Sequence, residues 1–80
     1  QIETLQTTEE IQIYPNPVQD ELIVEIPFGV NSIILRDLTG KVHQIEHSGN
    51  SFNCSGLDAG IYFISFDTYY KNYVIPFIKK

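Results

Sequence analysis

The sequence predicts an all-β domain, a small antiparallel β-sandwich of about seven strands. Short apolar runs alternate with polar residues, turn-forming residues separate these runs at short intervals, and no segment has the periodicity of an amphipathic helix. The chain has 80 residues, which is enough for one small hydrophobic core but not for two. We therefore expect a single domain.

The N-terminal third should contain a linker and two strands. Residues 1–10 are polar and carry three acids and no base, which is typical of a linker. A short strand is expected over 11–14, and Pro15 and Pro17 follow it. Because proline cannot donate to a β-ladder, that strand should lie at a sheet edge. The next strand, 21–26, alternates apolar and acidic residues, so one of its faces should be buried.

The middle of the chain predicts a hairpin and a short strand. A strand over 32–36 leads into a segment that begins with Asp37 and has Gly40 at its fourth position, the pattern of a type I turn with a bulge. The return strand, 41–46, is mostly polar and should be an outer one. A short strand is expected over 51–54.

The densest run of β-branched and aromatic residues extends from Gly60 to Phe66 and predicts the central strand. Its entry has the form Leu-x-x-Gly-x-Tyr, the spacing of a tyrosine corner, in which Tyr62 would bond to upstream backbone. Gly60 should permit the sharp turn. These features make the predicted sandwich immunoglobulin-like. The expected core comprises Leu22, Val24, Ile26, Leu35, Leu57, Tyr62, Ile64 and Phe66.

The last strand is expected over 73–78. Pro76 leaves its pairing in doubt, because it has no N–H to donate. Ile61 and Phe63 lie on the face of the central strand opposite the core, while Tyr73, Ile75 and Phe77 share one face of the last strand. A domain this small should not cover both sets, so we expect exposed apolar surface near the C-terminus and an edge strand able to pair with a partner.

Composition excludes several classes of function. The formal net charge of -5 argues against a nucleic-acid partner. No apolar run approaches the roughly 20 residues of a membrane helix. The single Cys excludes an internal disulfide framework. The sequence contains no Met, so we expect the chain to be part of a larger protein.

Catalysis, cofactors and bound metals are not expected. His43 and His47 would lie about 13 Å apart on one strand at about 3.3 Å per residue, too far to share a zinc ion, and no ligand set completes a site with Cys54. Solvated histidines and a buried Cys are the favoured interpretation. Asp20 and Glu21 lack the further oxygens that calcium requires. No Gly-x-Ser-x-Gly sequence surrounds a serine.

Four segments resemble the type A C-terminal sorting domain of proteins exported by the type IX secretion system (Por secretion system) of Bacteroidetes-type bacteria. Together they span nearly all of the chain after the linker. They are Tyr14-Pro15-Asn16-Pro17 with Asp20 and Leu22, then Asp37-Leu38-Thr39-Gly40-Lys41, then Leu57 to Ile64, and finally Phe77-Ile78-Lys79-Lys80.

The resemblance implies that residues 11–80 are a sorting signal attached to an N-terminal cargo protein. Such a domain stays folded in the periplasm, is recognised by an outer-membrane translocon and a shuttle protein, and brings the cargo across the outer membrane. A sortase-like peptidase at the cell surface then removes it. The cut should fall in or just before residues 1–10. The cargo is either released or joined to a surface lipopolysaccharide.

The resemblance also implies which residues carry recognition. Each has a simpler structural interpretation: the glycines serve backbone geometry, Asp37 caps its own turn, and Lys79 and Lys80 are solubilising charges. The candidates are Asp37, Gly40, Lys41, Gly60, Phe77, Ile78, Lys79 and Lys80.

Two other functions remain open. An immunoglobulin-like or fibronectin-like accessory module would bind a carbohydrate or a protein through exposed aromatic residues, and Tyr69, Tyr70 and Tyr73 are candidates for that role. A structural spacer between catalytic domains is the third possibility. A sorting domain must be C-terminal in its precursor, whereas a spacer or a binding module can lie anywhere.

Overall fold

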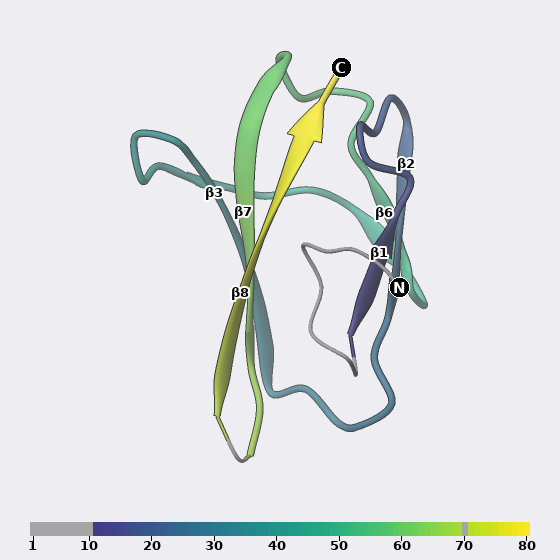
Figure 1. Cartoon of the computed structure of the whole chain (residues 1–80), viewed down its shortest axis with the longest axis vertical. Helices are drawn as coiled ribbons and strands as arrows, with labels where there is room; N and C mark the ends of the chain where they lie inside the picture. The colour runs from purple at the N-terminus through teal and green to yellow at the C-terminus, as the bar shows by residue number, and fades with distance from the viewer. Residues whose placement is uncertain (1–10, 70) are drawn as a thin grey trace, which may run out of the picture.

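The computed structural model describes residues 11–69 and 71–80, which form two four-stranded sheets packed face to face (Figure 1). The predicted all-β sandwich is confirmed: the described residues contain no helix, and all strand pairs within the sheets are antiparallel. The number of strands is eight rather than about seven. The predicted linker, residues 1–10, lies outside the described residues.

The first sheet has the strand order β1-β2-β6-β5. In β2, Leu22 and Val24 are buried while Glu21 and Glu25 are exposed, as the alternating sequence predicts. β1 lies at the sheet edge, in agreement with Pro15 directly after it. The strands of this sheet are β1 (Gln12–Tyr14), β2 (Glu21–Glu25), β5 (His47–Ser48) and β6 (Ser51–Asn53).

The second sheet has the strand order β4-β3-β7-β8. The stretch predicted to be central is β7, and it pairs with β3 on one side and with β8 along its whole length on the other. The strands of this sheet are β3 (Ser32–Asp37), β4 (Val42–His43), β7 (Gly60–Asp67) and β8 (Asn72–Lys79).

The extra strand arises from the segment predicted as one outer strand over 41–46. Only Val42 and His43 pair with β3. The chain then crosses to the other sheet, where His47 and Ser48 pair with β6 as β5. Both β4 and β5 are therefore outer strands of two residues, on different sheets.

Pro76 does not interrupt the last strand. β8 is continuous, and its register places Pro76 opposite Phe63. Ile78, two residues further on, directs its N–H to the Asn16 side chain and its C=O to the Val18 N–H, so both groups point away from β7. Alternation places the nitrogen of Pro76 at the same outer edge, where no ladder hydrogen bond is lost.

The core lies between the two sheets. Six of the predicted core residues are buried, but Ile26 and Leu57 are only partly buried, because both lie just outside strands and pack against the margin of the core. Of the two apolar sets that a domain this small was not expected to cover together, the one on the last strand faces inward: Tyr73, Ile75 and Phe77. The buried hydrophobic residues are Ile11, Ile13, Val18, Leu22, Val24, Leu35, Phe52, Cys54, Tyr62, Ile64, Phe66, Tyr73, Ile75 and Phe77.

The predicted tyrosine corner is present at the start of β7. The Tyr62 hydroxyl donates a hydrogen bond to the Asp58 carbonyl oxygen at 2.7 Å. Gly60 between them has a φ of 153°, a conformation that L side chains rarely adopt. The Tyr62 ring stacks on Phe77 with a centroid separation of 5.7 Å. The corner therefore fixes the start of β7 and supports the end of β8.

Candidate functional site

The eight residues predicted to carry recognition come together at one end of the second sheet. The register aligns Asp37, at the end of β3, with Tyr62 of β7, and Tyr62 with Phe77 of β8. Gly60 lies opposite Lys79 in the same way. The β3–β4 turn, the start of β7 and the C-terminal end of β8 thus lie at the same end of the second sheet, with β7 in the middle and the turn projecting to the side away from β8 (Figure 1).

The β3–β4 turn is built around the Asp37 carboxylate. Its Oδ1 atom accepts hydrogen bonds from the Thr39 N–H at 2.9 Å, the Thr39 hydroxyl at 2.6 Å and the Lys41 N–H at 3.0 Å. The Gly40 N–H donates to the Asp37 carbonyl oxygen at 2.9 Å, and Gly40 has a φ of 91°. The turn predicted from Asp37 and Gly40 is confirmed, and Lys41 is left exposed on it.

His43 completes this turn rather than being solvated as expected. Its Nε2 atom lies 2.8 Å from Oδ2 of Asp37, and both side chains are about one quarter exposed (26% and 23%). The hydrogen bonds from His43 and Thr39 hold the pKa of Asp37 well below its ordinary value of 3.8. The carboxylate is therefore ionised throughout the neutral range, and it organises the turn in that form.

Because the pKa of Asp37 is lower in the folded state than in the unfolded state, its charge stabilises the fold above about pH 4, and this contribution is lost as the pH falls below that value. We expect Asp37→Asn to lower the free energy of unfolding at pH 6. The difference from the native chain should shrink as the pH drops below about 4. Urea denaturation at several pH values measures this, and a difference that stays constant down to pH 2 would contradict it.

The C-terminal end of β8 is held by the segment that follows β1. The Val18 N–H donates to the Ile78 carbonyl oxygen at 2.8 Å, and the Lys80 N–H donates to the Val18 carbonyl oxygen at 2.8 Å. The Asn16 Oδ1 atom accepts from the Ile78 N–H at 2.9 Å. We call these contacts between residues 16–18 and 78–80 the terminal clamp. They join two segments that the sequence singled out separately.

Sequence reasoning identified both segments but did not predict their contact. The one available indication was an asparagine between two prolines, because its side-chain carbonyl oxygen can accept a hydrogen bond from the backbone N–H of another segment. Val18 forms an isolated parallel bridge with Lys79 and is fully buried. The clamp thus ties the last strand of the second sheet to the chain that leaves the first.

Burial divides the predicted recognition residues into two groups. Phe77 is 1% exposed and Lys79 is 8% exposed, so neither presents its side chain to a partner. The Lys79 ammonium donates to the Lys80 carbonyl oxygen at 3.0 Å, which corrects its interpretation as a freely solvated charge. Ile78 and Lys80, in contrast, are exposed and point outward.

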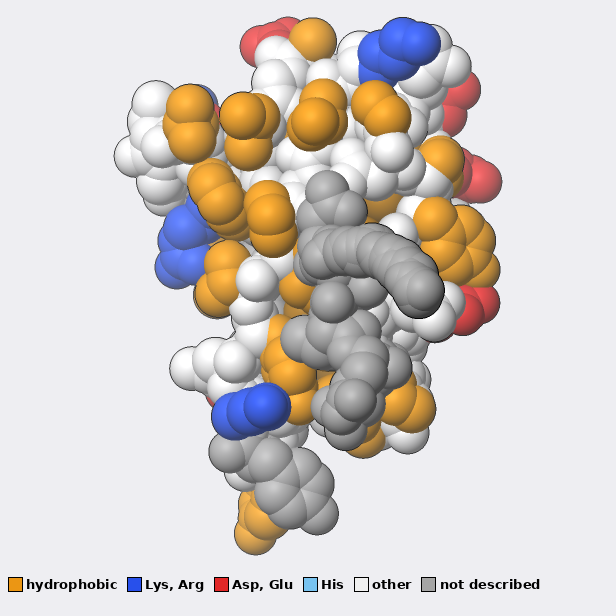
Figure 2. Space-filling view, viewed as in Figure 1, with side chains coloured by type: hydrophobic (Ala, Val, Ile, Leu, Met, Phe, Trp, Pro, Cys, Tyr) orange, Lys and Arg blue, Asp and Glu red, His pale blue; other side chains and the backbone are white. Residues whose placement is uncertain are grey.

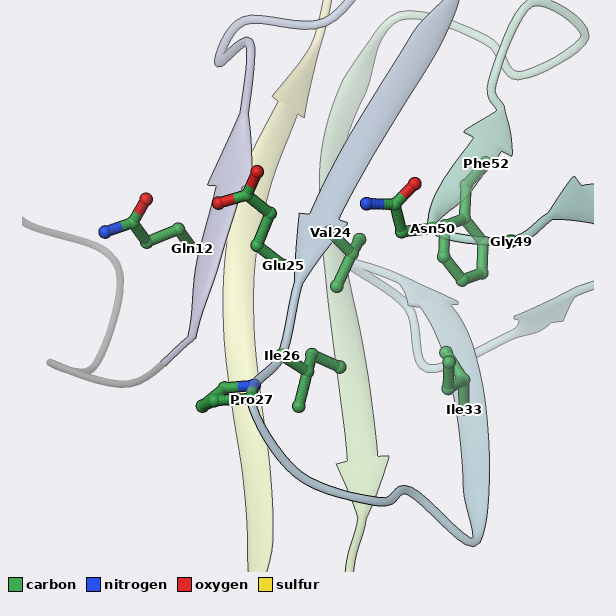
Figure 3. A pocket seen from close by; sticks show the side chains of 9 residues that line it. All are labelled: Gln12, Val24, Glu25, Ile26, Pro27, Ile33, Gly49, Asn50 and Phe52. Carbon is green, nitrogen blue, oxygen red and sulfur yellow. The ribbon is translucent and has the colours of Figure 1, made fainter.

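A cavity of about 490 Å³ opens between the two sheets at the other end of the domain (Figure 3). Val24 and Phe52 line it from the first sheet and Ile33 from the second. Glu25 is the one charged side chain in its lining, and its Oε2 atom already accepts a hydrogen bond from the Tyr14 hydroxyl at 2.6 Å. Small-molecule sites normally combine apolar walls with convergent polar groups. Gln12, Glu25 and Asn50 supply the polar side chains of this lining, and none of the residues predicted to carry recognition lines it.

The other side chains considered for chemistry are separated. His43 belongs to the second sheet, whereas His47 belongs to the first and stacks on Phe52 at 4.9 Å. Cys54 is buried, and burial raises the pKa of its thiol. Residues 11–69 and 71–80 contain no group of three or more His, Cys, Asp or Glu that could hold a metal ion. They also contain no helix long and apolar enough to cross a membrane.

The model of one protein family, described as the secretion system C-terminal sorting domain, matches residues 12–80, which is most of the chain. The chain belongs to this family. The match includes all four segments on which the resemblance was based, and the sorting domain is therefore a type IX secretion signal. No curated protein and no solved structure gives a significant match.

Membership in the family fixes the coarse function of the sorting domain. It implies an N-terminal cargo, involvement of the type IX secretion machinery of Bacteroidetes, and export to the cell surface or into the medium. Secretion signals of this kind are generally not catalytic. The structure adds that the terminal clamp and the Asp37 turn occupy the same end of the second sheet.

Proposed function

We propose that the type IX machinery recognises the end of the second sheet that holds the Asp37 turn, Gly60 and the terminal clamp. The observation that carries this proposal is the convergence of these segments through the β3–β7–β8 register. In this account Lys41, Ile78 and Lys80 supply the exposed contacts. The buried Phe77 and Lys79 hold β8 in place, and Gly40 and Gly60 serve the backbone.

The sorting domain, residues 11–80, would carry its cargo in the folded state. The terminal clamp supports this, because it joins the two sheets: residues 16–18 connect β1 and β2 of the first sheet, and residues 78–80 end the second. A receptor that binds this end of the second sheet in the periplasm would therefore select folded sorting domains. The shuttle protein and the outer-membrane translocon are the expected receptors.

Removal of the domain is the last step of the proposal. Residues 1–10 are polar and carry three acids and no base, a composition suited to an extended and accessible segment. A sortase-like surface peptidase would cut in or just before this segment. The cargo would then be released or joined to a surface lipopolysaccharide.

A reporter protein fused in front of Gln1 tests this sequence of events in a bacterium that has a type IX system. We expect the reporter in the medium or on the cell surface, and mass spectrometry of its C-terminus should show that residues 11–80 are absent. In a strain without the surface peptidase, the exported reporter should retain them. An exported reporter that keeps the domain in a strain with the peptidase would contradict the proposed cut.

The alternative of a ligand-binding accessory module has lost part of its support. Tyr73, one of its three aromatic candidates, is only 8% exposed and stacks on Phe28 with a centroid separation of 5.6 Å. Tyr69 is exposed, while Tyr70 lies outside the described residues. Of the two candidates that the structure describes, only Tyr69 is exposed, which weakens the support for an aromatic platform.

A further inference from the structure

The outer face of the second sheet carries an apolar stripe. Residues paired across antiparallel strands point to the same side, so the row Arg36–Phe63–Pro76 and the row Ile34–Ser65–Val74 share one face. This face is opposite the row Leu35–Ile64–Ile75, which is buried in the core. We call it the outer apolar face. Its apolar members are Ile34, Val42, Ile61, Phe63, Val74, Pro76 and Ile78.

This face is exposed in the described structure. Val74 is 61% exposed, and Val42, Ile61 and Ile78 are each nearly half exposed. The expectation of exposed apolar surface near the C-terminus is thus met, by Ile61 of β7 and by Val74 and Ile78 of β8. Contiguous apolar surface of this kind commonly marks an interaction site on a soluble domain.

A shallow hollow of about 390 Å³ lies within the outer apolar face. It forms because Ser65, a small residue, is paired between Ile34 and Val74. Arg36 lines one part of its wall and Asp67 another. Ile34 and Val74 supply apolar side chains to the lining, which can receive a projecting apolar side chain, as interface hot spots commonly do.

Charge is strongly segregated between the two sheets. Residues 32–43 and 59–80, which form the second sheet, hold all five Lys and Arg residues and two acids, a formal net charge of +3. Residues 11–31 and 44–58 hold five acids and no Lys or Arg. Figure 2 shows basic side chains along the left side and also at the top, where acidic ones are close by, while most other visible acidic side chains lie on the right. An acidic partner would therefore approach the second sheet.

The edges of the second sheet are poorly suited to strand pairing. At the outer edge of β8, residues 78–80 are already bonded by the terminal clamp, and Pro76 offers no N–H. At the other edge, β4 has only two residues. A partner is thus better accommodated on the face of this sheet than along its edges.

We propose that the outer apolar face docks a protein surface of the export machinery that presents apolar side chains surrounded by Asp and Glu. This inference rests on the proposed function, and it extends the contact area from the end of the sheet onto its face. Arg36 and Lys80 would meet the acidic groups, and the hollow at Ser65 would receive one apolar side chain. A lipid surface fits less well, because it favours several clustered cations and this face presents two.

Val74 offers a sharp test, because it is exposed and can be replaced by either charge. An acidic partner should be repelled by Glu at this position and attracted by Lys. We expect Val74→Glu to slow export of a reporter fused to the full chain about tenfold relative to Val74→Lys. Both variants remove the same apolar side chain from the same strand position. Asp67 is the diagonal neighbour of position 74 on the adjacent strand, whereas Arg36 lies two strands away, so any effect on stability should favour Lys over Glu and has to be measured separately from export. Thermal unfolding of both variants checks this.

The outcomes separate the docking surface from the sorting role. If the unmodified chain is exported and the two variants are exported equally, the docking proposal is wrong while the sorting role stands. If the reporter fused to the unmodified chain is not exported, the docking proposal and the sorting role are both wrong. If the purified chain binds vesicles of anionic phospholipid and Val74→Glu abolishes this binding, the outer apolar face docks on a membrane and the proposed protein partner is wrong. If analytical ultracentrifugation shows concentration-dependent self-association that Val74→Glu abolishes, the outer apolar face binds a second copy of this chain and the proposed partner is wrong.

Discussion

Deletion of Phe77 to Lys80 should leave a reporter fused to the sorting domain trapped in the periplasm. The deletion removes the Ile78 and Lys80 backbone groups that bond to Val18 and Asn16, so the terminal clamp cannot form. It also removes Phe77, which is fully buried against Tyr62. Loss of a buried Phe side chain alone costs about 3–5 kcal/mol. Small domains are stabilised by little more than that.

Two milder variants separate the loss of the fold from the loss of recognition. Lys80→Ala removes an exposed charge at the chain end and should slow export while leaving the unfolding temperature unchanged. Asn16→Ala removes one hydrogen bond of the clamp and should lower stability by about 1 kcal/mol, with a smaller effect on export than the deletion. Lys79 is unsuitable for this comparison, because it is buried and its replacement would also disturb packing.

Export is measured as the fraction of reporter in the medium over time, with the periplasmic fraction recovered in parallel. Accumulation of the truncated fusion in the periplasm is the expected result. If the truncated fusion reached the medium at the normal rate, the C-terminal end of β8 would not be the recognised element. The sorting role of this chain end would then have to be abandoned in favour of a binding module.

The parts of the fold that were predictable are those set by local chemistry. β2 alternates Leu and Val with Glu, so its pattern determines both its conformation and its buried face. The Asp37 turn needs an acid that bonds to nearby N–H groups and a glycine with positive φ, and both are fixed within five residues. The tyrosine corner is similarly local.

The parts that were not predictable depend on contacts between distant segments. In β8 both faces are apolar: Tyr73, Ile75 and Phe77 alternate with Val74, Pro76 and Ile78, so the pattern could not decide which set is buried. The crossing that divides β4 from β5 depends on which sheet offers a free edge. Such an edge exists only after the sheets have formed.

The candidate site combines both kinds of information. Local motifs identified its residues, but the β3–β7–β8 register was needed to bring them to one end of the sheet. The contact between Asn16 and Ile78 spans 62 positions in the sequence, and no local rule predicts a pairing over that separation. The same register explains why Phe77 and Lys79 support the site from within while Ile78 and Lys80 face outward.

Among single substitutions, replacing a buried side chain of the central strand with Ala should have the largest effect on stability. Phe66 and Ile64 are both completely buried in β7, which pairs on both sides. Replacing either with Ala leaves a cavity between sheets that cannot easily close, because each neighbouring strand is fixed by its own ladder. We expect a loss of about 2–5 kcal/mol for Ile64→Ala and about 3–5 kcal/mol for Phe66→Ala.

Ile61 provides the matched control, because it lies on the same strand but is nearly half exposed on the opposite face. Ile61→Ala should lower the free energy of unfolding by much less than Ile64→Ala does, since substitutions at exposed positions usually change it by about 0.5 kcal/mol or less. Urea denaturation of the three purified variants, followed by far-ultraviolet circular dichroism, measures the difference. Equal losses at positions 61 and 64 would mean that the two faces of β7 are buried alike. The outer apolar face could not then be an accessible docking surface.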